Sequence, residues 1–222
     1  MGTGAPIPMH TEAVLTLAQW LSPAFPIGAF SYSHGLEWSV ENGDVHDADS
    51  LCAWLSAITK YGAGRNDLLL LAAAHRAQDT AELAEIDTLA RALAPSKERL
   101  LETVQQGDAF VRTVSDVWLH DLPGLTLPVA VGAAAQAQRL PLDLTAQMFL
   151  QAFISSLVSA AIRLIPIGQT DGQKCIAALA PLCRRTAERA LQQNLDDLGA
   201  SCFLSDIASM KHETQYSRLF RS

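Results

Sequence analysis

The sequence is poor in charge, in aromatic residues and in cysteine. Of its 222 residues, 18% are charged, 6% are aromatic and 49% are hydrophobic, a balance that excludes an intrinsically disordered chain. The four cysteines are Cys52, Cys175, Cys183 and Cys202, and no two form a C-x-x-C pair. Four cysteines are too few for a disulfide scaffold, so we expect a reducing, cytoplasmic setting.

Basic charge is also scarce. The formal net charge is −7, and the whole acidic excess lies in residues 1–94, where four Lys and Arg residues accompany eleven Asp and Glu residues. The start of the chain has neither the basic nor the apolar segment of a signal peptide. The sequence therefore predicts no nucleic-acid binding and no attachment to anionic membranes. The acidic excess itself has no predicted partner.

The motifs of common enzyme classes are missing. The sequence has no phosphate-binding loop, no dinucleotide fingerprint, no G-x-S-x-G elbow and no H-E-x-x-H pair. No two of the six histidines have the spacing of metal ligands on one helix, so we predict no metal site and no resident cofactor. We also predict no catalytic residue, although a Cys–His pair distant in sequence stays open as a minor alternative.

Strand patterns are absent as well, and helix formers dominate. The chain contains 35 alanines and 32 leucines, the strongest apolar helix formers. We predict an all-α fold, a single domain of residues 1–222 with about ten helices, a flexible leader (1–10) and a flexible tail (214–222). The expected helices cover residues 11–21, 31 or 33 to 41, 49–61, 68–76, 80–93, 96–119, 129–139, 144–164, 170 onward with a break at Pro181, and 196–213.

The apolar helix at about 144–164 is long enough to span a bilayer. A polar residue recurs at every fourth position, which makes burial in lipid costly, so we interpret it as a central core helix. The polar stripe has two interpretations: small side chains that let a neighbouring helix approach, or a polar route or subunit interface. Its members are Gln147, Gln151, Ser155, Ser159 and Arg163.

Two segments are unusually rich in polar, proline and aromatic residues. The first, residues 22–37, combines Pro23, Pro26 and serines with Gly35, which inside a helix costs about 1 kcal/mol relative to alanine unless another backbone approaches it closely. The second is the tail, which alternates tyrosine, arginine, leucine and phenylalanine. These are residue types of interface hot spots, so we predict a tail that becomes ordered on binding a partner.

Together with Ile167-Gly168-Gln169-Thr170-Asp171-Gly172-Gln173, these segments resemble the UreF family of urease accessory proteins. The family pattern runs approximately S-P-x-x-P-x-G-x-[FY]-[ST]-[YH]-S-x-G-L-E, then G-Q-x-x-x-Q, then H-E-x-x-x-S-R-L-F-x-S. The chain matches all three motifs in order, at the length of the family.

The resemblance implies a cytoplasmic, all-helical and often dimeric chaperone without enzymatic activity. Such proteins assemble with a bridging accessory protein (UreD or UreH) and a nickel-carrying GTPase (UreG) and assist nickel insertion into apo-urease. Nickel and GTP would then belong to the complex and not to this chain. Two alternatives remain: an assembly factor for another metalloenzyme, and a helical protein that associates with membranes or binds a small molecule.

The resemblance also directs attention to individual residues. We expect the tail to dock on the bridging protein, and the first motif to lie beside the tail or on the face toward the GTPase. The alternatives are a solvated tail and a first motif that only caps and packs. Two finer hypotheses stay open: an arginine finger from Arg218 or Arg221, and nickel passage along the polar stripe. The predicted partner-binding residues are Ser31, Tyr32, His34, Gly35, Glu37, Gln169, Gln173, His212, Glu213, Tyr216, Arg218, Leu219, Phe220 and Arg221.

Overall fold

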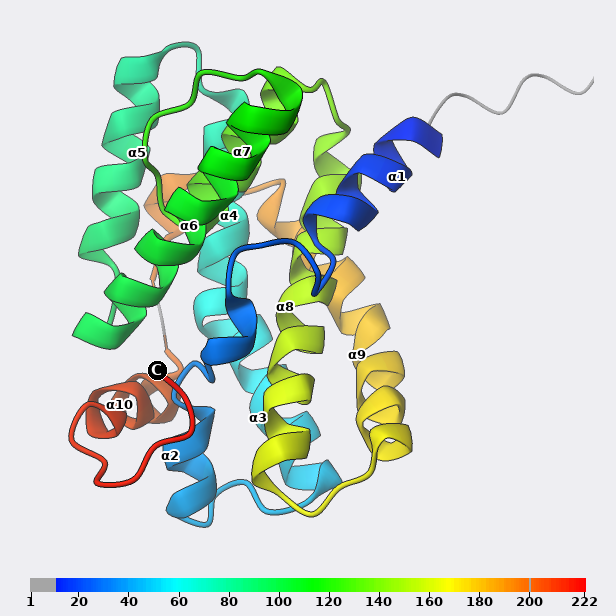
Figure 1. Ribbon diagram of the computed structural model, residues 1–222, viewed down its shortest axis with the longest axis vertical. Coiled ribbons are helices and arrows are strands. Elements are labelled where there is room, and N and C mark those ends of the chain that lie inside the picture. The colour runs from blue at the N-terminus through cyan, green and yellow to red at the C-terminus, as the bar shows by residue number, and fades with distance from the viewer. Residues whose placement is uncertain (1–10, 200) are drawn as a thin grey trace, which may run out of the picture.

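A computed structural model describes residues 11–199 and 201–222, and over these ranges the chain is helical with no strand (Figure 1). The all-α prediction is therefore confirmed, whereas the predicted flexible leader lies outside the described residues. The elements are α1 (Thr11–Trp20), η1 (Ala29–Ser31), α2 (Leu36–Glu41), α3 (Ala48–Tyr61), α4 (Ala63–Arg76), α5 (Thr80–Ala92), α6 (Lys97–Trp118), α7 (Leu127–Ala137), α8 (Leu142–Leu164), α9 (Gln169–Ala190), η2 (Leu195–Asp197) and α10 (Phe203–His212).

The long apolar helix α8 packs against α9, α4, α2 and α3. Its inward residues recur at spacings of three and four, among them Leu150, Ile154, Leu157 and Ala161, and all four are buried. Among the described residues, α8 is the one helix long and apolar enough to cross a membrane, and half of its most apolar window is buried inside the protein. Core helices of soluble proteins pass the same test, so the structure is compatible with the predicted core role.

The alanine content has a clear structural use in the contact of α7 with α4. Nearly all of α7 is buried, and its small side chains let the two helices approach closely. At Gly132 a Cβ atom would lie 2.3 Å from the carbonyl oxygen of Leu71, so only glycine fits. Close helix contact through Ala and Gly thus accounts for a core with few aromatic residues.

Several predicted helix boundaries were wrong. Helix α2 begins at Leu36 and not at Ser31 or Ser33, and α4 begins at Ala63, five residues earlier than predicted. The helix predicted from 196 is replaced by the short turn η2 and by α10, which begins at Phe203. The N-cap residues of α2, α4 and α10 give no side-chain hydrogen bond, so the usual capping signal was missing there. At α2 the Ser33 hydroxyl, two residues before the N-cap, accepts a hydrogen bond from the Glu37 N–H at 3.2 Å.

Helix α9 departs from prediction at two points. It starts at Gln169 after Gly168, and Thr170 does not form the predicted capping box. It also continues through Pro181, where a break was expected. The residue one turn before the proline, Ala177, is exposed, so its carbonyl group, which receives no N–H from the proline, lies at the surface and water can satisfy it.

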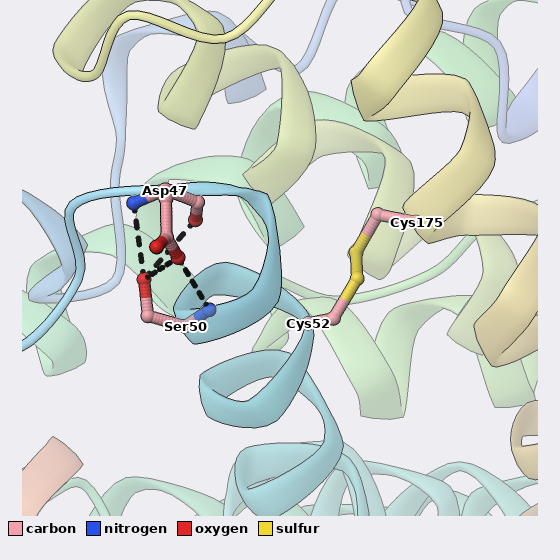
Figure 2. The surroundings of a disulfide bond; sticks show 4 residues. All are labelled: Asp47, Ser50, Cys52 and Cys175. Atoms are coloured by element: carbon pink, nitrogen blue, oxygen red, sulfur yellow. Dashed lines mark hydrogen bonds between the residues drawn. A yellow bond between two sulfur atoms is a disulfide. The ribbon is translucent and has the colours of Figure 1, made fainter.

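A disulfide joins Cys52 of α3 to Cys175 of α9 (Figure 2). The sequence analysis did not foresee this pair, because the two cysteines are 123 residues apart and only the packing of α3 on α9 brings their Cα atoms to 5.7 Å. The same figure shows the start of α3. Asp47 accepts a hydrogen bond from the Ser50 N–H, and the Ser50 hydroxyl accepts one from the Asp47 N–H.

Candidate functional site: the packed tail and the outer face of α10

The first motif shapes a loop that receives α10. His34 and Gly35 both have positive φ angles, 60° and 77°, in the left-handed region that favours glycine. A Cβ atom on Gly35 would lie 2.8 Å from the backbone nitrogen of Ser209 in α10. The expected close approach of another backbone is thus present, although Gly35 precedes α2 and is not inside a helix.

The carboxylate of Glu37 lies at the centre of the site. Glu37 is in the first turn of α2 and is buried. Its two oxygens accept hydrogen bonds from the backbone N–H groups of Leu219 and Phe220, at 2.6 and 2.9 Å. A residue of the first motif therefore fixes the backbone of the tail, 182 residues further along the chain.

His212 links this carboxylate to α6. The imidazole is fully buried, with one ring nitrogen 3.1 Å from Glu37 and the other 2.6 Å from Glu98. The second oxygen of Glu98 accepts a hydrogen bond from Arg218 at 2.6 Å. We call Glu37, Glu98, His212 and Arg218 the Glu37–His212 cluster. It alternates acidic and basic groups, so each buried polar group in it has a partner.

The last residues complete the packing of the tail. Ser33 donates hydrogen bonds from its backbone N–H (2.9 Å) and from its hydroxyl to the carbonyl oxygen of Ser222. The Ser222 hydroxyl donates to Glu102, which also forms an ion pair with Arg99. The Arg221 N–H donates to the carbonyl oxygen of Ser31 at 2.8 Å. The structure thus packs the tail against the chain itself, in place of the flexible tail that we predicted (Figure 1).

This packing separates the predicted partner-binding residues into inner and outer sets. The inner set is buried and cannot touch a partner in this arrangement: Tyr32, His34, Gly35, Glu37, His212 and Phe220. Phe220 in particular lies in the hydrophobic core, with the guanidinium group of Arg163 4.5 Å from its ring centre. The outer set is exposed: Tyr216, Arg218, Leu219 and Arg221.

Contacts with α6 fix further predicted residues near the tail. The Tyr32 hydroxyl donates a hydrogen bond to Gln105 at 2.6 Å, and burial raises the pKa of the phenol. Glu213 is half-buried, and its carboxylate accepts a hydrogen bond from the Lys97 N–H at 2.8 Å. Ser31 is also half-buried, at the end of η1. Ser31 and Glu213 therefore border the inner set and keep part of their surface accessible.

Gln169 and Gln173 do not join the site. Both are exposed at the start of α9. In Figure 1 this end of α9 and the packed tail lie on opposite sides of α8. The middle motif is therefore a separate surface feature, and the three motifs do not form one site.

The polar stripe of α8 lies at the surface. Gln147 and Gln151 line an open groove of about 550 Å³ between α8 and α9, together with Met148. Further along, Ser159 and Arg163 are exposed, while Ser155 is half-buried. Arg163 donates a hydrogen bond to the carbonyl oxygen of Phe30 at 3.0 Å, so the end of the stripe joins the first motif.

The outer face of α10 carries an apolar surface that the sequence analysis missed. Phe203 and Leu204 are 68% and 79% exposed, and Ile207 and Met210 are about half exposed. The inner face of the same helix has small or polar residues, such as Ser205 and Ser209. The signal was present in the sequence as apolar residues at spacings of three and four, but it pointed away from the core and not toward it.

The described residues contain no group of three or more His, Cys, Asp or Glu side chains arranged to hold a metal ion. The carboxylates of the Glu37–His212 cluster are engaged by arginine, by histidine and by backbone N–H groups. The site is therefore structural. The Glu37–His212 cluster, below also called the clasp, holds the tail and α10 in place, and the outer face of α10 and the outer tail residues form an exposed surface over it.

The comparisons with known proteins agree on one family. The UreF family model matches residues 45–180. A urease accessory protein UreF from Ruegeria pomeroyi is 54% identical over 211 residues, which covers 95% of this chain and 97% of the relative. The chain belongs to the UreF family. The UreF of Roseobacter denitrificans is 52% identical, with 96% of each chain covered, and that of Rhodopseudomonas palustris strain HaA2 is 49% identical, with 99% of this chain and 98% of the relative covered.

Proposed function

We propose that this chain is a urease maturation factor without enzymatic activity. In this role it acts as a cytoplasmic chaperone that assembles with a bridging accessory protein of the UreD or UreH type and with a UreG-type GTPase, and thereby assists nickel insertion into apo-urease. Family membership supports the maturation role. The observation that carries the binding role is the exposed apolar face of α10, held in place from behind by the Glu37–His212 cluster.

The outer surface of α10 and the tail suits a protein partner. Phe203, Leu204, Ile207 and Met210 supply apolar area, while Tyr216 and Arg221 supply residue types that are enriched in interface hot spots. An exposed apolar surface rimmed by polar groups typically marks an interaction site. We assign this surface to the bridging accessory protein.

Co-purification with the bridging protein tests this assignment. Leu204→Asp should abolish recovery of the partner, because it places a charge in the middle of the apolar face. Leu15→Asp on α1 is the matched control, since Leu15 is also an exposed leucine on a helix and α1 lies at the opposite end of the molecule from α10 (Figure 1). Recovery of the partner by Leu204→Asp at the level of the control would overturn the assignment.

We place the homodimer contact at the groove between α8 and α9. The groove offers both Met148 and the amide groups of Gln147 and Gln151, a mixture that suits a self-complementary contact. Gln151→Glu should shift the protein from dimer to monomer in light scattering at micromolar concentration, because the symmetric contact brings equal charges together. An unchanged mass would refute this location.

The packed tail also bears on the arginine-finger hypothesis. Arg218 forms an ion pair with Glu98, whereas Arg221 is exposed and lies beside two neutral groups, Gln105 at 3.5 Å and the Tyr32 hydroxyl. Arg221 is therefore the candidate of the two. Single-turnover GTP hydrolysis by the partner GTPase should slow when Arg221→Lys replaces the wild-type chain. Unchanged hydrolysis would leave Arg221 with a binding role alone.

Urease activity in a deletion strain separates this proposal from the alternative of an assembly factor for another metalloenzyme. Restoration of urease activity by the wild-type chain, but not by Leu204→Asp, is the expected outcome. Failure of the wild-type chain to restore activity would favour the alternative.

A further inference from the structure

The disulfide between Cys52 and Cys175 plays no part in the docking surface described above. It joins α3 to α9, whereas α10 packs against α2 and α6. It is the one disulfide among the described residues, since Cys183 and Cys202 are free. In the proposed cytoplasmic setting disulfides are rare, and those that form are usually transient and redox-sensing. The pair is therefore a candidate for a redox-dependent role.

Helix packing brings the two cysteines together. Figure 2 shows Cys52 near the start of α3 and Cys175 on α9, with their side chains directed toward each other. Leu51 and Leu55 of α3 and Leu179 of α9 are buried in the hydrophobic core, so apolar packing holds the two helices together without the covalent bond. The two thiols of the reduced protein therefore stay close, and the bond can form again within the chain.

The two sulfur atoms differ in access from solution. Cys175 is 2% exposed, whereas Cys52 is half-buried. Exchange between thiols and disulfides depends on which sulfur an attacking thiolate can reach. Cys52 is therefore the sulfur that a small thiol attacks, and Cys175 is the sulfur that leaves.

Reduction then takes two exchange steps. The thiolate of a small thiol of the glutathione class attacks Cys52 Sγ and forms a mixed disulfide, while Cys175 leaves with the electron pair of the broken S–S bond and takes a proton from water. A second small thiolate attacks the other sulfur of the mixed disulfide, and Cys52 leaves as a thiolate that is protonated in turn. Two small thiols are oxidised to one small disulfide, and the protein disulfide is reduced to two thiols. The reverse sequence, with the small disulfide as the oxidant, restores the bond.

The position of Cys175 in α9 decides what the bond holds. Cys175 lies two residues after Gln173, an exposed residue of the middle motif, and six residues before Pro181. Pro181 lies inside α9 and has no N–H, so the backbone hydrogen-bond ladder of the helix is interrupted there. The bond therefore ties to α3 the part of α9 that carries the motif and precedes this interruption.

We propose that Cys52 and Cys175 form a reversible dithiol–disulfide pair that sets how firmly the first part of α9 is held against α3. The oxidised pair closes a loop across 123 residues of sequence, which restricts the unfolded chain and stabilises the fold. In the reduced protein, packing alone holds the motif-bearing part of α9. The thiol–disulfide balance of the cell then controls the stability of the chain and the setting of its middle motif.

Equilibration of the full chain in glutathione buffers tests whether the pair is reversible. The buffers run from the thiol alone to an excess of the disulfide, and free cysteines are counted by alkylation of the denatured chain and mass spectrometry. The count should fall from all four cysteines to Cys183 and Cys202 alone. A pair that stays oxidised in every buffer, or reduced in every buffer, would overturn the proposal.

Single substitutions test which sulfur is attacked. In Cys175→Ser, Cys52 has no partner and should form a mixed disulfide with glutathione. In Cys52→Ser, the buried Cys175 should stay free. Cys183 is the internal control, because it is 3% exposed and should stay free in both variants. Glutathione on Cys175 but not on Cys52 would refute the assigned order of attack.

Thermal unfolding and hydrogen–deuterium exchange measure the consequence of reduction. Reduced wild type should have a Tm about 10 °C below that of the oxidised chain, given the length of the closed loop and the size of the protein. The double variant Cys52→Ser, Cys175→Ser should have the lower Tm in both buffers, whereas the control Cys202→Ser should keep the wild-type difference. Amides of residues 169–180 should exchange faster after reduction, and those of residues 182–190 should keep their rates.

Two results would contradict the proposed consequence: an unchanged Tm after reduction of the pair, or equal changes in exchange on both sides of Pro181. If the double variant is unfolded, wild type in the two buffers decides, because that comparison needs no substitution. All of these readouts use the chain alone and concern α3 and α9. Failure of the redox pair and failure of docking through α10 are therefore distinguishable.

Discussion

Two buried histidines, His212 at the end of α10 and His34 before α2, have completely different surroundings. His212 lies between the carboxylates of Glu37 and Glu98, and both of its ring nitrogens have partners. His34 faces a cavity, and its Nδ1 atom has no partner among the described residues. The first histidine holds the tail in place, whereas the second is an unsatisfied group that burial keeps neutral.

The comparison shows that burial alone does not determine what a polar residue does. In the Glu37–His212 cluster, every charged group meets an opposite charge or a backbone N–H, so the cluster stabilises one arrangement of the tail. In the cavity, Arg99 is shared among several acids, and at least one of them gains by staying protonated. The cluster therefore fixes one arrangement of the tail, whereas burial raises the pKa of Asp67, which lines the cavity, to about 7.

The largest effect is expected from removing the carboxylate of Glu37, the hydrogen-bond acceptor at the centre of the Glu37–His212 cluster. Glu37→Ala leaves two backbone N–H groups and one imidazole nitrogen without their acceptor. Removal of one partner from a buried ionic cluster costs about 3–5 kcal/mol. Urea unfolding followed by circular dichroism should show this loss, and trypsin should cleave more readily after Arg218. Glu85→Ala, on the exposed face of α5, is the control, and an equal effect there would contradict the clasp.

A second substitution separates close approach from backbone strain. Gly35→Ala should cost about 3 kcal/mol, because alanine is strained at positive φ and its Cβ atom would meet the backbone of Ser209. Gly43→Ala should cost only about 1 kcal/mol, since Gly43 has a similar φ of 83° but no atom near its Cβ position. Equal losses in thermal unfolding would mean that α10 does not press on Gly35.

The sequence predicted most of the helices but not the long-range contacts that hold the tail in place. Helical periodicity and the Ala and Leu content predicted the helices, because both signals are local. The link between Glu37 and the tail spans more than 180 residues, so no local pattern could reveal it. The motifs identified the segments that meet, but they gave no sign that Phe220 packs into the core beside Arg163, because that direction depends on tertiary packing.

The same reasoning explains the missed features. Glu98 and Glu102 are spaced by four residues on the inner side of α6, and sequence alone gives no reason for acids to face inward. The outer face of α10 was missed because apolar spacing alone does not distinguish a face that packs on the core from one that is exposed. A helix with small polar residues on one face and large apolar residues on the other fits a docking helix, and that contrast in side-chain size was readable.

A third substitution tests how burial affects the ionisation of Asp67, which lines the cavity beside His34. Burial raises the pKa of the Asp67 carboxyl group to about 7, so the contribution of this group to folding stability falls as pH rises from about 4 through 7. Asp67→Asn removes this loss, so the variant should match wild type near pH 4 and exceed it by about 2 kcal/mol at pH 8, below the full linkage value because the half-buried carboxylate keeps part of its hydration. Asp116→Asn, at an exposed position of α6, should show no such divergence in urea unfolding. Parallel curves for Asp67→Asn and wild type would mean that Asp67 ionises freely.

The smallest expected effect concerns the contact between the clasp and α8. Arg163→Met removes the guanidinium group over the Phe220 ring and the hydrogen bond to Phe30, but it keeps an unbranched apolar stem. Because Arg163 is exposed and Phe220 stays buried through the core and Glu37, the loss should be about 0.5–1 kcal/mol, or about 2–3 °C in Tm. Arg112→Met, on the exposed face of α6, should leave Tm unchanged. A loss near that of Glu37→Ala would instead place Arg163 inside the clasp, and the tail would then depend on α8 as much as on α6.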